Sequence, residues 1–129
     1  MKGHVFYTGD KAKSAAWEFA TKNNMETIDM TEIGESTSSW CEEIRKCKME
    51  KEGWTEDDFW KRIGRPVWES MSRSFAFSTP TKQENVYVFI EREYYKDKKK
   101  FKAPTAGVLH SVEHPALKEM GKKVHVCLV

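Results

Sequence analysis

The string His110-Ser111-Val112-Glu113-His114 is the most visible set of residues that could do chemistry. On a helix, the two histidines would share one face and could hold zinc, with Glu113 as general base. Pro115 disfavours that geometry, because the residue before a proline is pushed out of the helical region. No distant third ligand presents itself in the sequence. We therefore expect no metal site, and a zinc peptidase is the least favoured interpretation.

A second candidate set is Trp68, Ser72 and Phe75, which recur at the spacing of one helical face. Taken alone, that spacing predicts core packing with one hydroxyl among the rings. Cys41 has no histidine placed to activate it, and we interpret it as structural. The basic run 96–102 could contact phosphates, but a solvated loop explains it equally well. Because no aromatic stacking platform accompanies that run, it does not indicate nucleic-acid binding.

The composition limits the kind of protein that can carry these groups. The chain has 129 residues, of which 39% are hydrophobic and 12% aromatic, as in a packed domain rather than a disordered chain. Its 22 basic and 20 acidic residues give a net charge of +2, which excludes a strongly basic nucleic-acid-binding domain. No apolar stretch is long enough to cross a membrane.

The cysteine count and the first residues bear on location. Three cysteines are odd in number and too few for a small disulfide-stapled domain, so we expect free thiols, with a Cys41–Cys47 pair as the oxidised alternative. Residues 4–7 resemble a first strand rather than a signal peptide. We expect a cytoplasmic protein, or one delivered into the cytosol of a target cell, and secretion stays an open alternative.

The elements that must position the candidate residues alternate along the chain. We expect helices at 12–24, at 40–62 with a break near Gly53, and from Pro66 onward; strands at 4–7, 25–31, 85–90 and 124–129; and loops at 34–39 and 91–102. This alternation predicts an α/β fold in which residues 1–129 form one domain: a small parallel or mixed sheet of about four strands with helices packed on it. In such sheets ligands bind at the carboxyl ends of the strands. The residues there are Tyr7, Thr8, Gly9, Asp29 and those after Ile90.

Five short segments, in order, resemble the ADP-ribosyl cyclase / NAD glycohydrolase family. Phe6-Tyr7-Thr8-Gly9 is similar to its aromatic-Trp-Ser opening, Thr27-Ile28-Asp29-Met30-Thr31 to its T-L-E-D-T, and Ser39-Trp40-Cys41 to its T-W-C. The most specific block, V-W-E-S-M-S-R-S-F-A at 67–76, resembles F-W-K-T-V-S-R-R-F-A, and Ser111-Val112-Glu113 matches S-V-E. The resemblance spans nearly the whole chain and implies an ADP-ribosyl cyclase-like fold.

The resemblance also implies a function: an NAD(P)+ nucleosidase or ADP-ribosyl cyclase, in toxin or signalling biology, that releases nicotinamide and forms ADP-ribose, its cyclic form or both. It implies a catalytic set of Glu113, Trp68 and Ser72. The substrate-binding set that it implies is Tyr7, Thr8, Gly9, Asp29, Arg73 and Ser111. No cofactor or metal is implied, because NAD(P)+ is the substrate. Neither nucleic acid nor a membrane is an expected partner, and a homodimer or an inhibitory protein stays open.

These residue types suit the chemistry. Departure of nicotinamide builds oxocarbenium character on the ribose carbon, which a fixed carboxylate stabilises. No general acid is needed, because the leaving group departs neutral. An indole face attracts the cationic pyridinium ring by about 0.5–2 kcal/mol.

The chain departs from the family pattern at several positions. Tyr7 stands where tryptophan is usual, Asp29-Met30 replaces a Glu-Asp pair, and His110 replaces a glycine. The many cysteines and the additional N-terminal helical part of the surface enzymes are missing, so the compact toxin-like or intracellular relatives are more similar. A catalytically silent domain that binds NAD or ADP-ribose is therefore the alternative, and the choice between hydrolase and cyclase stays open.

Overall fold

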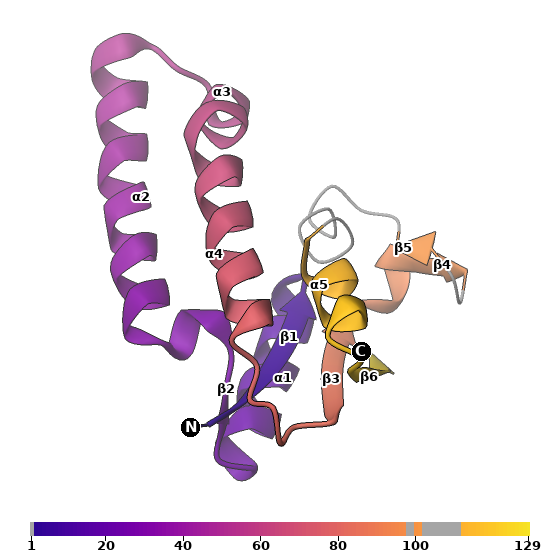
Figure 1. Ribbon diagram of the computed structural model, residues 1–129. Coiled ribbons are helices and arrows are strands. Elements are labelled where there is room, and N and C mark those ends of the chain that lie inside the picture. Colours follow the sequence, from indigo (N-terminus) through magenta and orange to yellow (C-terminus); the bar gives the residue numbers. More distant parts are fainter. Residues whose placement is uncertain (1, 98–99, 102–111) are drawn as a thin grey trace.

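The structure is a computed structural model that describes residues 2–97, 100–101 and 112–129 (Figure 1). Its elements are β1 (Gly3–Thr8), α1 (Asp10–Lys22), β2 (Met25–Glu26), the 3-10 turn η1 (Ile28–Met30), α2 (Glu32–Glu52), α3 (Glu56–Phe59), the π turn η2 (Trp60–Gly64), α4 (Arg65–Phe77), β3 (Asn85–Ile90), the 3-10 turn η3 (Arg92–Tyr94), β4 (Tyr95–Asp97), β5 (Lys100–Phe101), α5 (His114–Glu119) and β6 (Lys123–Leu128). The expected strands at 4–7, 85–90 and 124–129 are confirmed, as is the helix at 12–24.

Four strands form one parallel sheet in the order β2-β1-β3-β6. Val5 of β1 pairs with Tyr87 of β3, and Asn85 of β3 pairs with Lys123 of β6. The expected α/β class, with a small parallel sheet and helices packed on it, is thereby confirmed. Because parallel strands all run the same way, their carboxyl ends meet at one edge of the sheet.

Side chains pack on both faces of the sheet, since successive residues of a strand point to opposite sides. On one face, buried side chains of β3 pack with Phe75 of α4 and Leu117 of α5. On the other face, Val5 packs against Ala16 and Ala20 of α1. The small alanines let α1 lie close to the sheet. The β1–α1 turn lies at the carboxyl edge of the sheet because it directly follows the last residue of β1.

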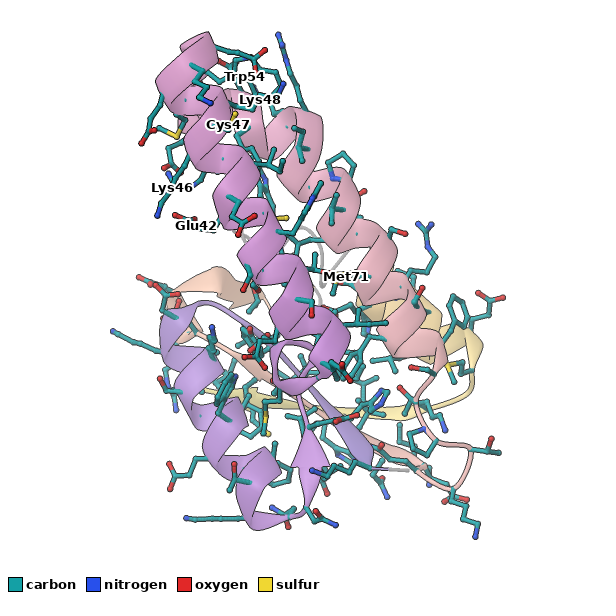
Figure 2. The ribbon with its side chains drawn as sticks, turned by 90° about the vertical axis from the view of Figure 1, so that its left-hand side faces the viewer. Glu42, Lys46, Cys47, Lys48, Trp54 and Met71 are labelled. Atoms are coloured by element: carbon teal, nitrogen blue, oxygen red, sulfur yellow. The ribbon has the colours of Figure 1, made fainter. Side chains whose placement is uncertain are left out.

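Two long helical runs, α2 and the α3–η2–α4 rod, extend side by side away from the sheet (Figure 1). The expected break near Gly53 is confirmed: Gly53 ends α2 with φ 68°, a left-handed conformation that suits glycine. Thr55 and Asp58 then form a capping box that begins α3. At this far end the Lys48 ammonium lies 5.0 Å from the ring centre of Trp54 (Figure 2).

The expected loop at 34–39 is wrong, because these residues belong to α2. The Thr31 hydroxyl begins the helix by accepting a hydrogen bond from the Gly34 amide at 3.0 Å. Gly34 is required by close packing rather than by a loop, since a Cβ atom there would lie 1.9 Å from the Ile28 carbonyl oxygen. The glycine therefore lets α2 pack directly on η1.

Replacing Gly34 with alanine is expected to destabilise the protein by about 1–3 kcal/mol, because the backbone of η1 must move to accept the methyl group. Thermal unfolding of Gly34→Ala beside Ser36→Ala, an exposed position on the same helix, measures this effect. Equal melting temperatures for the two variants would show that the close contact with Ile28 is not maintained.

Three further expectations need correction. The strand expected at 25–31 ends at Glu26 and is followed by η1, where Thr27 caps the turn. The helix expected to begin at Pro66 is instead the continuation of the helical run that starts with α3. Pro66 has no amide proton to donate, and it lies directly after the π turn η2, in the first turn of α4. The loop expected at 91–102 contains the short antiparallel pair β4–β5. The phosphate-contacting interpretation of the run 96–102 rests on side chains outside the described residues.

All three cysteines are free, with Cys41 buried and Cys47 exposed, so the alternative of a Cys41–Cys47 pair is not observed. Among the described residues, no helix is both long enough and apolar enough to span a membrane.

Candidate functional site

A cavity of about 270 Å³ lies at the carboxyl end of β1. Its walls come from β1, the β1–α1 turn, η1 and α4, from Glu113 just before α5, and from single residues of α1, α2 and η2. The structure thus brings together these expected site residues: Tyr7, Thr8, Gly9, Asp29, Trp68, Ser72 and Glu113. They come from four separate parts of the chain.

Among the described residues, one expected site residue, Arg73, does not line this cavity. Arg73 is exposed on α4, and its expected substrate-binding role stays a prediction. Neighbouring residues of a helix point about 100° apart, and Arg73 therefore cannot share the face of Ser72. Ser111 and His110 lie outside the described residues.

The helical stripe on α4 serves both the core and the cavity. Phe75 packs edge-on against Phe6 and stacks on the His4 ring at a centroid distance of 3.9 Å, as core packing predicts. Ser72 is buried yet lines the cavity, and Trp68 is half-buried there. The same spacing that indicates a core stripe therefore also delivers a ring and a hydroxyl to the site.

Glu113 is buried, with 6% of its surface exposed, at the N-cap position immediately before α5. Burial raises its pKa to about 8, and the negative charge of Asp29 contributes to the shift. Contrary to expectation, His114 is the first residue of α5, because Pro115 is tolerated within the first helical turn. Ala116 and Leu117 anchor the helix in the core behind Glu113.

Asp29 is held by donors from two other elements. The Tyr7 hydroxyl donates to its Oδ1, and the Trp17 indole Nε1 donates to its Oδ2 at 2.7 Å. Lys13 Nζ lies 3.9 Å from the same Oδ2, partly in solvent. Burial and the Asp29 carboxylate raise the pKa of Tyr7, so it stays a neutral phenol and a donor. The Tyr7 phenol is thus used to fix Asp29.

The turn between β1 and α1 depends on Gly9 and on Glu91, the residue that follows β3. Gly9 has φ 95°, and a Cβ atom there would lie 2.2 Å from Glu91 Oε2. The other Glu91 oxygen accepts the Lys11 amide at 3.0 Å, within the first turn of α1. Glu91 is buried and does not line the cavity, so it stabilises the turn without being part of the cavity wall.

Sequence reasoning did not find four residues that belong to this site: the lining residues Lys13, Ser38 and Trp60, and Trp17 behind Asp29. Ser38 was expected in a loop, and Lys13 and Trp17 look like solvated positions of an amphipathic helix. Trp60 precedes Trp68 by eight residues, a spacing that could have placed both rings on one side of a helix.

The cavity combines aromatic walls, two carboxylates and one lysine among its described lining residues. Such a site suits a cationic aromatic ring, because ring faces and carboxylates both attract positive charge. Within the part of the chain that the structure describes, no group of three or more His, Cys, Asp or Glu side chains could hold a metal ion.

Comparison with protein-family models, with curated proteins and with solved structures gives no match for this chain.

Proposed function

We propose that this protein is an NAD(P)+ nucleosidase or ADP-ribosyl cyclase with an ADP-ribosyl cyclase-like fold. The observation that carries the proposal is the cavity, which gathers the buried Glu113 and Ser72 and the half-buried Trp68 and Tyr7 from distant parts of the chain. These are the residues that the family resemblance, read from the sequence, assigns to one site. If the resemblance were only a chance match of short sequence segments, it would not explain why these residues lie in one cavity.

In the proposed reaction the bond between the ribose carbon and the nicotinamide nitrogen breaks, and its electron pair leaves with neutral nicotinamide. Ionised Glu113 stabilises the positive charge that develops on the ribose carbon, or captures that carbon covalently. Trp68 and Tyr7 flank the pyridinium ring, and Ser72 contacts ribose oxygens. Water then adds to the carbon and loses a proton, which gives ADP-ribose; attack by an adenine nitrogen gives the cyclic product.

The electrostatics support this assignment of roles. A substrate pyridinium entering the cavity meets Glu113 and Asp29, and its positive charge favours ionisation of Glu113, whose pKa is about 8 without ligand. Substrate binding therefore helps to generate the reactive form of the enzyme. Lys13, at the edge of the cavity, is positioned for the negatively charged diphosphate.

The test is incubation of the purified protein with NAD+ and, separately, with NADP+, with the products resolved by chromatography. Nicotinamide release in excess of spontaneous hydrolysis supports the proposal, and the ratio of ADP-ribose to cyclic ADP-ribose distinguishes hydrolase from cyclase. Binding of NAD+ by calorimetry without release of nicotinamide would instead identify a catalytically silent binding domain.

A further inference from the structure

The lining residues of the cavity are buried at one end, which we call its bottom, and exposed at the other, which we call its mouth. Ser72 and Glu113 are buried, whereas Lys13, Ser38 and Trp60 are exposed. Small-ligand pockets commonly enclose about 300–1,000 Å³, and this cavity, at about 270 Å³, lies just below that range. It can enclose one half of a dinucleotide but not both.

The proposed function places the nicotinamide ribose beside Glu113, at the buried bottom. The other half of the substrate, an adenosine, must then leave through the mouth. Trp60 is the aromatic residue at that mouth, with 37% of its surface exposed. It precedes Trp68 by eight residues on one helical rod, or about 12 Å along the axis. An extended diphosphate bridge separates two bases by a comparable distance.

The local backbone is arranged around the Trp60 ring. Trp60 is the first residue of the π turn η2, and such turns are frequently found at functional sites. Gly64 closes this turn, and a Cβ atom there would lie 2.8 Å from Trp60 Cε3 and 3.3 Å from Phe59 Cε1. The glycine therefore leaves space for the ring to lie against its own helix, beside the mouth of the cavity.

We propose that Trp60 is the stacking platform for the adenine ring of the dinucleotide. The inference rests on the proposed function for the position of the nicotinamide end, and it concerns the opposite end of the substrate. Removing an aromatic ring on which a base stacks weakens binding by roughly 5- to 150-fold.

Turnover of two substrates tests this proposal. NAD+ carries the adenosine, whereas nicotinamide mononucleotide has the same reacting bond and lacks it. Trp60→Ala is expected to lower kcat/KM for NAD+ about tenfold and to change kcat/KM for the mononucleotide far less. Trp60→Phe retains a ring and is expected to recover most of the loss. Trp40→Ala, an exposed tryptophan on α2 that does not line the cavity, is the matched control.

Equal losses with both substrates, or an unchanged value for NAD+, would overturn the assignment of Trp60 while leaving the proposed function intact. Calorimetric binding of ADP-ribose to the same variants is independent of catalysis. If the wild type released nicotinamide from neither substrate, the proposed function would fail, and this second measurement would decide the inference alone. Weaker ADP-ribose binding in Trp60→Ala, but not in Trp40→Ala, supports the adenine platform; equal binding in both, or no binding to the wild type, refutes it.

Discussion

Replacing Glu113 with glutamine is expected to lower nicotinamide release from NAD+ by about 1000-fold, because the amide cannot stabilise the oxocarbenium charge as a carboxylate does. The substitution keeps the size of the side chain, so the cavity and substrate binding are retained. Steady-state release by Glu113→Gln beside Glu119→Gln, an exposed glutamate of the same helix, measures the effect. Activity within tenfold of the wild type would remove Glu113 from the mechanism.

The same variant is expected to be more stable than the wild type in alkaline solution. The folded-state pKa of Glu113 is about 8, against an ordinary value of 4.5, so the folded protein binds an extra proton between these values. The wild type therefore loses stability as the pH rises from 4.5 to about 8, and the full penalty is present above 8. Glutamine carries no such charge.

The expected gain for Glu113→Gln is on the order of 1–3 kcal/mol above pH 8. Below pH 4.5, where both side chains are neutral, the gain is lost and only the desolvation cost of the buried amide remains. The alkaline gain is less than the whole pKa shift implies, because a buried amide also has a desolvation cost. Urea unfolding at pH 5 and pH 9 checks the expectation. A gain that is equal at the two pH values would show that Glu113 is not held neutral by its surroundings.

The second large effect is on the pH dependence of turnover. Because ionised Glu113 is the reactive form in the proposed mechanism, kcat/KM for NAD+ is expected to rise with pH through a midpoint near 8. Asp29→Asn removes the negative charge that contributes to this pKa, so the midpoint is expected to move down by roughly one unit. Burial, the larger cause of the shift, is unchanged, and the midpoint therefore stays above 4.5.

Tyr7→Phe is the matched control for this experiment. It removes the hydrogen bond to Asp29 Oδ1 but keeps the carboxylate charge, and Lys13 Nζ still lies 3.9 Å from the other oxygen, Oδ2. Its kcat/KM falls if Asp29 must be held in place, but its midpoint is expected to stay near that of the wild type. A midpoint that moves equally in both variants would show that the hydrogen-bond geometry, and not the charge of Asp29, sets the pKa of Glu113.

Local sequence patterns predicted most of the helices and strands around the cavity. They failed where contacts between distant segments decide the conformation. The apolar run of β3 and the glycine stop at Gly53 have short-range causes, and both are confirmed. The segment 34–39 is rich in residues typical of loops, yet it is helical because Thr31 caps it and Gly34 fits against Ile28. Such a contact between chain segments leaves little trace in local composition.

The sequence by itself determined the α/β class and the types of residue at the carboxyl edge of the sheet, where the cavity lies, because periodicity and residue chemistry are local properties. Only the tertiary structure decided which of those residues meet. It placed Arg73 in solvent and Ser72 in the cavity, although the two are adjacent in the chain. It also recruited Trp17 to hold Asp29 and Trp60 to the mouth of the cavity. The physical reason is that burial, the charge around Glu113 and the direction of each side chain depend on how separate elements pack together.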